Sequence, residues 1–157
     1  MCGIVSYLGK SDSVPILLKG LQRLEYRGYD SAGLALIDAD NLSCIKQSGK
    51  VSELNSKIEK ISIKGSYGIA HTRWATHGPP NDTNAHPHLD KTGKIALVHN
   101  GIIENYGSIK MTLEGRGVKF TSDTDTEVLV QLISELYYNN DKKVSFENAV
   151  KAALQEV

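Results

Sequence analysis

Two spacings of apolar residues recur along the chain and predict a mixture of strands and helices. Short apolar or alternating runs, typical of β-strands, lie at residues 4–8, 33–37, 42–47, 67–70, 94–98 and 118–122. Apolar residues three or four positions apart, typical of amphipathic helices, lie at residues 13–26, 51–61, 105–113, 124–136 and 145–157. The two kinds of run do not alternate one for one, so this pattern leaves both α/β and α+β folds open.

Short polar residues mark where several of these elements begin. Asp12 is suited to cap the first helix, and Asn105 to cap the third. Thr124 and Glu127 have the spacing of a capping box, which predicts a helix start at this point. The turn-rich sequence DADN at residues 38–41 predicts a hairpin between the second and third strands.

The last predicted helix carries an apolar stripe along one face. Its members are Phe146, Val150, Leu154 and Val157. No glycine, proline or polar stretch closes this helix, so we expect a domain that is incomplete at its C-terminal end.

Composition narrows the classes of function. Hydrophobic residues make up 40% of the 157 positions, which is enough for one domain with a core of its own. The 18 basic and 18 acidic residues balance and are scattered, so we expect neither a nucleic acid nor a membrane as partner. No apolar run is long enough to span a bilayer and no targeting segment is recognisable, so a cytoplasmic protein is expected.

The two cysteines, at positions 2 and 44, suggest different roles. Cys44 lies inside a predicted strand and is interpreted as a packing residue. Removal of Met1 would leave Cys2 with a thiol and a free α-amine, which together supply a nucleophile and a base. In model compounds the thiol has a pKa of roughly 8.5 and the α-amine a pKa of roughly 7.7–8.0. Both values are close to neutral pH, where a proton passes readily between such groups. For a cysteine taken alone, a small apolar role in a buried strand is the more frequent interpretation.

Three further segments combine side chains that suit a ligand better than a core. The sequence AHTRWATHG at residues 70–78 follows a predicted strand and supplies Arg73, which can bind a carboxylate. Asn100 and Gly101 follow another predicted strand and suit an oxyanion hole, although a plain Asn-Gly turn is the simpler interpretation. Asp125, at a predicted helix N-terminus, is expected to stay ionised, and alone it is more often a cap than a ligand. Together these groups match the carboxylate, the ammonium and the amide of glutamine.

The five histidines raise the question of whether the chain binds a metal ion. They occupy positions 71, 77, 86, 88 and 99, and only His86 and His88 are close together in the sequence. No cysteine or acidic ligand accompanies that pair, so we expect neither a metal site nor another cofactor.

Six stretches of sequence together resemble one family. MCGIV, LEYRGYDSAG, GIAHTRWATHG, NAHPH, VHNGIIEN and SDTDTE are similar to the glutaminase domain of glutamine–fructose-6-phosphate aminotransferases, from Met1 to at least Glu127. The second-position cysteine and the Asn-Gly pair are shared by class II glutamine amidotransferases generally, whereas LEYRGYDSAG and HTRWATHG resemble the sugar-aminating branch. The resemblance implies an α+β fold of the N-terminal-nucleophile hydrolase type. That fold is a four-layer α/β/β/α sandwich with antiparallel sheets, which we expect to be C-terminally incomplete here.

The resemblance also implies a role for each site residue. Cys2, freed by removal of Met1, would attack the glutamine carboxamide and form a γ-glutamyl thioester, with release of ammonia and then of glutamate. Its own α-amine would carry the proton, and Asn100 and Gly101 would stabilise the oxyanion. Arg73, with Thr76 and His77, would bind the α-carboxylate of the substrate, and Asp125 would bind its α-amine. Arg27 and Gly28 match the loop at the nucleophile, and Trp74 matches a loop that closes over the substrate.

Partners and alternatives follow from the same resemblance. In a full-length enzyme, the ammonia would pass to fructose 6-phosphate in a C-terminal isomerase portion, which these 157 residues do not resemble, and the enzyme would be a homodimer or a higher oligomer. The alternatives are another class II amidotransferase, an inactive domain that binds glutamine, and a soluble α/β domain in which Cys2 and Asn100 are structural.

Overall fold

The larger sheet consists of four antiparallel strands in the order β1-β4-β2-β3. The structure, a computed structural model, describes residues 2–74, 78–139 and 144–157. The strands span Gly3–Leu8 (β1), Ser31–Asp38 (β2), Asn41–Ser48 (β3) and Tyr67–Arg73 (β4). The predicted hairpin is confirmed, with Asp38 paired to Asn41 across the turn between β2 and β3. β4 runs three residues beyond its predicted end, which brings Arg73 into the sheet.

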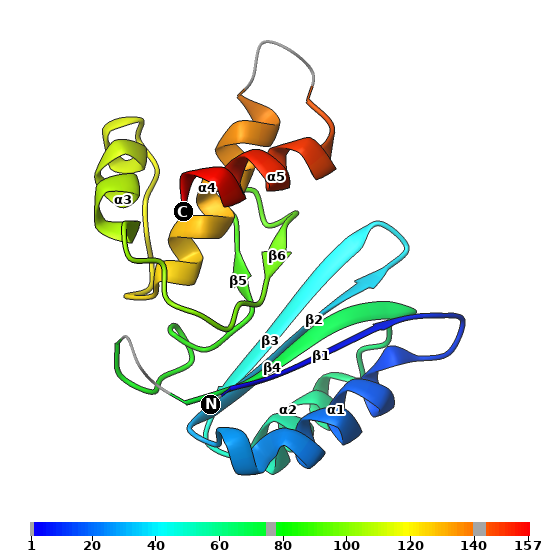
Figure 1. Cartoon of the computed structure of the whole chain (residues 1–157). Helices are drawn as coiled ribbons and strands as arrows, with labels where there is room; N and C mark the ends of the chain where they lie inside the picture. Colours follow the sequence, from blue (N-terminus) through cyan, green and yellow to red (C-terminus); the bar gives the residue numbers. More distant parts are fainter. Residues whose placement is uncertain (1, 75–77, 140–143) are drawn as a thin grey trace.

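Two helices cover the outer face of this sheet (Figure 1). They are α1 (Ser13–Leu24), which continues into the short 3-10 helix η1 (Glu25–Arg27), and α2 (Val51–Ile61). Asp12 caps α1 as predicted, since its carboxylate accepts a hydrogen bond of 3.2 Å from the N–H of Val14. The apolar faces of both helices meet alternate residues of the strands in one core, which includes Leu17, Leu21, Leu34, Leu36, Leu54 and Ala70.

A small antiparallel ribbon lies on the other side of the sheet. It pairs β5 (His88–Leu89) with β6 (Ala96–Leu97), so the strand predicted at residues 94–98 forms a ladder over two residues only. Its approach to the sheet depends on Gly33 in β2, because a Cβ at this position would overlap the carbonyl oxygen of His86. The absence of a side chain at Gly33 therefore lets the segment before β5 lie directly on the sheet.

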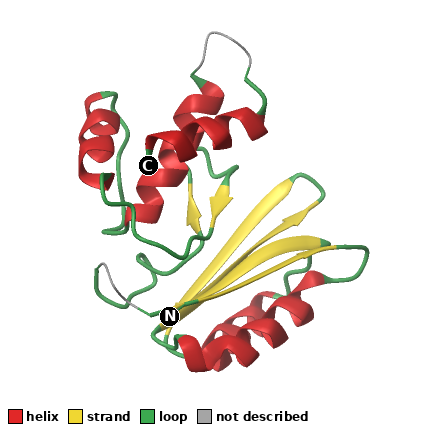
Figure 2. Cartoon of the chain, in the orientation of Figure 1, coloured by secondary structure: helices red, strands yellow, loops and turns green. Residues whose placement is uncertain are grey.

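Three more helices lie beyond the ribbon: α3 (Tyr106–Gly115), α4 (Asp125–Tyr138) and α5 (Phe146–Glu156). α4 packs directly on β5 and β6, and α3 and α5 pack against α4. The layers are therefore helix, sheet, sheet and helix (Figure 2), which confirms the predicted α+β sandwich. Within the described ranges, no helix is both long and apolar enough to cross a membrane.

The strand predicted at residues 118–122 is wrong. This segment belongs to neither sheet, and it runs instead beside the first turn of α4. The backbone N–H groups of Thr121 and Ser122 donate to the buried carboxylate of Glu127, at 2.9 Å and 2.6 Å. A side chain thus provides the acceptors that a neighbouring strand would otherwise have provided. Thr124 caps α4 as expected, accepting from the N–H of Glu127 at 3.3 Å.

The apolar stripe of α5 is not its buried face. Ala149 and Ala153 are its fully buried residues, and they face the core shared with α4. Small side chains four residues apart let two helices approach closely, and this contact sets the orientation of α5. Of the predicted stripe, Val150 is partly buried, and the exposed members are Phe146, Leu154 and Val157.

Asn105 occupies the N-cap position of α3, but its side chain does not cap the helix. Its amide donates instead to the carbonyl of Glu156, at 2.6 Å. The residue therefore links the start of α3 to the last turn of α5, and the prediction was right about the position and wrong about the role.

Candidate active site

A cavity of about 400 Å³ opens where β1 begins and β4 ends, a volume typical of a small-molecule site. It brings together residues that are far apart in the sequence and come from both halves of the sandwich. The predicted site residues that line it are Cys2, Arg27, Arg73, Trp74, Asn100, Gly101 and Asp125. Thr76 and His77, also predicted, lie outside the described residues.

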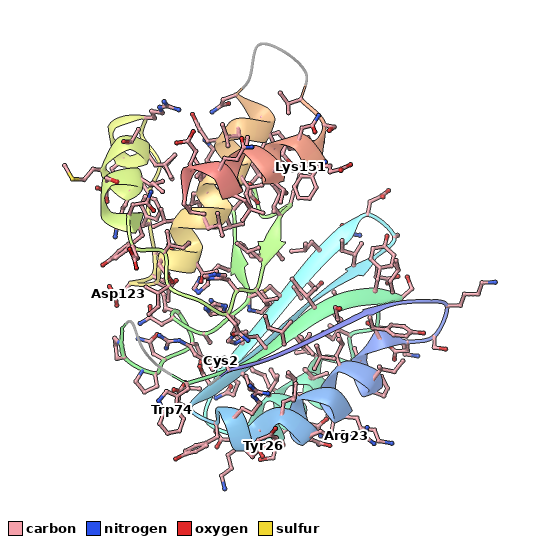
Figure 3. All side chains as sticks on the ribbon, viewed as in Figure 1. Cys2, Arg23, Tyr26, Trp74, Asp123 and Lys151 are labelled. Carbon is pink, nitrogen blue, oxygen red and sulfur yellow. The ribbon has the colours of Figure 1, made fainter. Side chains whose placement is uncertain are left out.

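Strand pairing places the thiol of Cys2. β1 and β4 run antiparallel with Gly3 opposite Thr72, so the residue before β1 meets the residues that end and follow β4. The backbone N–H of Trp74 donates to Sγ of Cys2 at 3.2 Å, and Sγ lies 3.7 Å from the carbonyl oxygen of Trp74. Figure 3 shows Cys2 and Trp74 together at this end of the sheet.

Gly28 packs directly against the backbone of Arg73 and Trp74. A Cβ built on Gly28 would lie 2.8 Å from the carbonyl carbon of Arg73 and 3.0 Å from the nitrogen of Trp74. Only a residue without a side chain lets η1 come this close to the end of β4. Arg27, one residue earlier, lines the cavity itself. The Arg27-Gly28 pair therefore lies at the same end of the site as Cys2.

The side-chain amide of Asn100 points toward Cys2. Its Nδ2 donates to the carbonyl oxygen of Cys2 at 3.2 Å, while its Oδ1 lies 2.8 Å from Nε2 of His71. Gly101 follows at the rim of the cavity, and a Cβ there would lie 2.6 Å from the ring of His99. Both residues line the same cavity as Cys2, and an amide donor beside a glycine N–H suits an oxyanion hole.

Side chains of opposite charge line the same cavity. Arg73, only 4% exposed, ends β4, and its guanidinium donates to the carbonyl oxygens of Pro79 and Gly78 at 3.4 Å and 3.5 Å. Asp125, 5% exposed, is the first residue of α4, and its Oδ2 accepts from the N–H of Ile103 at 2.9 Å. A guanidinium and a carboxylate on one cavity complement the two charges of an α-amino acid.

The indole of Trp74 forms part of the outer wall. It is 47% exposed and meets the ring of Tyr29 edge to face, with the ring centres 5.6 Å apart. An exposed aromatic side chain next to Cys2 is suited to cover a bound ligand.

The buried side chains of His71 and His86 form the inner wall of the cavity, with His88 packed beside them, and no role was predicted for these three residues. His71 stacks on His86 with ring centres 4.2 Å apart, and His88 meets His86 edge-on at 4.7 Å. Burial lowers the pKa of His71 to about 4 and that of His88 to about 3, and it also lowers the pKa of His86. All three are therefore neutral at pH 7.

A sequence signal for one of these histidines did exist. His71 and Arg73 are two residues apart directly after the strand predicted at residues 67–70, and because β4 continues through both of them they share one face of it. Within the described ranges, no group of three histidine, cysteine or acidic side chains is arranged to hold a metal ion.

Comparisons with known proteins find relatives along the whole chain. Residues 40–145 match the family described as "Glutamine amidotransferase domain". Glutamine–fructose-6-phosphate aminotransferase [isomerizing] of Bacteroides thetaiotaomicron is 57% identical over 158 residues, and those of Chlorobaculum tepidum and Thermus thermophilus are 51% and 53% identical. These alignments cover 100%, 100% and 97% of this chain. The chain spans only about a quarter of the length of these relatives.

Solved structures of similar fold include two enzymes at 30% identity. One is glutamine phosphoribosylpyrophosphate amidotransferase from B. subtilis, complexed with ADP and GMP, with a TM-score of 0.79. The other is described as the allosteric regulatory enzyme of purine biosynthesis, with a TM-score of 0.81. Each match covers 99% of this chain and 32% of the solved chain.

Proposed function

Because the chain belongs to the family of glutamine amidotransferase domains, we propose that it hydrolyses L-glutamine to L-glutamate and ammonia through a thioester on Cys2. One observation carries this proposal. The thiol of Cys2, the amide of Asn100, the guanidinium of Arg73 and the carboxylate of Asp125 all line one cavity. Glutamine offers a carboxamide, a carboxylate and an ammonium to these groups, so each part of the substrate has a partner of suitable chemistry.

Binding fixes the orientation of the substrate. Arg73 receives the α-carboxylate and Asp125 the α-ammonium, which leaves the side-chain carboxamide directed toward Cys2. Thr76 and His77 belong to this proposal as further contacts of the α-carboxylate. The indole of Trp74 closes over the bound amino acid and keeps bulk water away from the thioester.

The first half-reaction needs a free α-amine on Cys2, and so the removal of Met1. The amine takes the thiol proton, directly or through one water molecule, and the thiolate attacks the carboxamide carbon. The backbone N–H of Trp74, 3.2 Å from Sγ, stabilises that thiolate. Nδ2 of Asn100 and the N–H of Gly101 stabilise the negative charge that develops on the carbonyl oxygen. The ammonium then protonates the leaving nitrogen, the C–N bond breaks, and ammonia departs.

The second half-reaction restores the enzyme. The α-amine takes a proton from water, and the resulting hydroxide attacks the thioester carbon. The same oxyanion donors stabilise the second tetrahedral intermediate. The C–S bond breaks, the sulfur regains a proton, and glutamate leaves.

The activity of a whole enzyme forms a second part of the proposal. Relatives at 51–57% identity are named glutamine–fructose-6-phosphate aminotransferases, whereas the purine-enzyme structures are 30% identical. We therefore assign the ammonia to fructose 6-phosphate, with glucosamine 6-phosphate as product in a fused isomerase portion of an oligomeric enzyme. A reducing compartment such as the cytoplasm suits a nucleophilic thiol.

Glutamate release and covalent labelling test the glutaminase step. The purified protein should have an intact mass without Met1, release glutamate, and gain one adduct on Cys2 from 6-diazo-5-oxo-norleucine. Cys2→Ala should abolish both turnover and the adduct, whereas Cys44→Ala, which changes a thiol whose pKa burial raises to about 11, should retain both. Glutamate release by Cys2→Ala would refute the mechanism. Binding of glutamine without turnover by the Met1-free protein would indicate an inactive binding domain.

A further inference from the structure

The proposed chemistry leaves the buried histidines of the inner wall without a role. One of them, His71, is 1% exposed and touches the oxyanion-hole residue directly, with its Nε2 2.8 Å from Oδ1 of Asn100. An asparagine amide can face its surroundings in two ways that differ by a half-turn. Only one of these directs its N–H groups toward the reacting carbonyl.

The neighbours of Asn100 decide which way it faces. The carbonyl oxygen of Cys2 has no proton to donate, so the amide atom 3.2 Å from it must be the NH₂ nitrogen. The other amide atom, which faces His71, is then the oxygen. Because an amide oxygen can only accept a hydrogen bond, Nε2 of His71 must carry the ring proton, and Nδ1 carries none. Nδ1 is buried without a hydrogen-bond partner, which agrees with an atom that has no proton to donate.

We propose that His71 is a positioning residue for the oxyanion hole: its Nε2–H holds Oδ1 of Asn100, so that both amide hydrogens face Cys2 and the substrate carbonyl. One of these hydrogens binds the carbonyl of Cys2, and the second is free for the oxyanion. This assignment rests on the proposed function, because the amide orientation matters only if Asn100 stabilises a developing charge.

The surroundings of His71 suit a rigid donor. It lies in β4 between β1 and β2, opposite Ile4 on one side and Gly33 on the other, so its backbone is fixed by both neighbours. The ring of His86 stacks on it at 4.2 Å. Burial also lowers the pKa of His71 to about 4, so the ring carries a single proton across the neutral range. A donor that neither moves nor ionises holds the amide in one orientation.

Two substitutions separate this role from simple packing. In glutamine, the side-chain nitrogen reaches about as far from the backbone as Nε2 of histidine, whereas in asparagine it reaches only as far as Nδ1. His71→Gln therefore keeps a donor for Asn100, and His71→Asn removes it while remaining polar. Loss of a whole oxyanion donor costs about 10²–10³ in kcat. In His71→Asn the amide of Asn100 remains but is no longer held in one orientation, so kcat should fall about tenfold to a hundredfold, with KM within about threefold of the wild type.

Alkylation of Cys2 by iodoacetamide provides a matched control. That reaction displaces iodide and forms no oxyanion, so it reports the reactivity of the thiol alone. The alkylation rate, followed at Cys2 by peptide mapping, should be similar in the wild type and both variants, and His71→Gln should retain most of the glutaminase kcat. Equal loss of kcat in the two variants, an unchanged kcat in His71→Asn, or a parallel loss of the alkylation rate would each overturn the proposal.

The ring tautomer can be determined without turnover. Long-range ¹⁵N–¹H spectra should show His71 protonated at Nε2 and bare at Nδ1. The opposite tautomer in a protein that hydrolyses glutamine would overturn the positioning role and leave the proposed function intact. Absence of glutamine hydrolysis by the wild-type, Met1-free protein would refute the proposed function, whichever tautomer is observed.

Discussion

Replacing Gly28 by alanine tests whether close packing holds the backbone of Arg73 and Trp74 beside Cys2. The new Cβ would lie 2.8 Å from the carbonyl carbon of Arg73, 2.9 Å from its oxygen and 3.0 Å from the nitrogen of Trp74. All three are backbone atoms, so no flexible side chain can move aside. Ordinary contacts begin at 3.4 Å, so η1 and the end of β4 must separate by about 0.6 Å.

Both stability and activity should respond to this displacement. Overpacking of this kind typically costs about 1–3 kcal/mol in the free energy of unfolding. For a domain of this size, each kcal/mol corresponds to about 2–4 °C, so the melting temperature should fall by about 2–12 °C. The N–H that holds the sulfur of Cys2 belongs to the displaced backbone. Because a misplacement of about 1 Å can cost a hundredfold in rate, we expect about a tenfold loss in kcat/KM.

A second glycine-to-alanine change provides the control. Gly107 is exposed in α3, and a Cβ there would meet nothing within 4 Å. Gly107→Ala should leave kcat/KM unchanged and raise the melting temperature slightly, because alanine favours the helix. Thermal unfolding followed by circular dichroism and a glutamate-release assay measure both effects. A Gly28→Ala protein that matches Gly107→Ala in both assays would refute the packing argument.

Two further predictions concern the buried polar groups. Glu127→Gln should lower the free energy of unfolding by about 2–4 kcal/mol, because the carboxylate accepts from the backbone and hydroxyl groups of Thr121 and Ser122 and an amide has only one acceptor oxygen. Glu147 forms an exposed ion pair with Lys151, so Glu147→Gln should change the free energy of unfolding little. Equal urea midpoints for Glu127→Gln and Glu147→Gln would contradict the prediction. Acid should also destabilise the fold, since burial lowers the pKa of His71 to about 4 and the unfolded chain takes up its proton below about pH 6.5. The free energy of unfolding should therefore fall as the pH drops from about 6.5 toward 4, and it should fall less steeply in His71→Gln. Urea denaturation of both proteins at several pH values measures this change. The same dependence on pH in the two proteins would contradict the prediction.

Local signals in the sequence located most elements. Asp12 and Thr124 cap helices because a short polar side chain can reach the first free N–H groups, and this depends only on nearby backbone. The turn at residues 38–41 produced the predicted hairpin for the same reason. Local signals failed at residues 118–122, where the side chain of Glu127, and not a strand, supplies the acceptors.

The candidate site was predicted in part. Cys2, Arg73, Asn100, Gly101 and Asp125 combine chemistry that a core does not need, so they could be chosen from the sequence, and the resemblance to a known family sharpened the choice. Their common cavity depends on the pairing of β1 with β4 and on the position of α4, which no local pattern encodes.

Periodicity, caps and side-chain type are local properties, so the sequence was enough to place most helices and strands and to identify side chains that can carry chemistry. Which of these groups meet depends on the tertiary fold. Ala149 and Ala153, and not the larger apolar residues, face the core because α4 approaches α5 closely. In the same way, His71 and Asn100, 29 residues apart, form a hydrogen bond because the segment after β6 returns to the end of β4. Burial and hydrogen bonding select such contacts across the whole fold, and so they became visible only once the chain was folded.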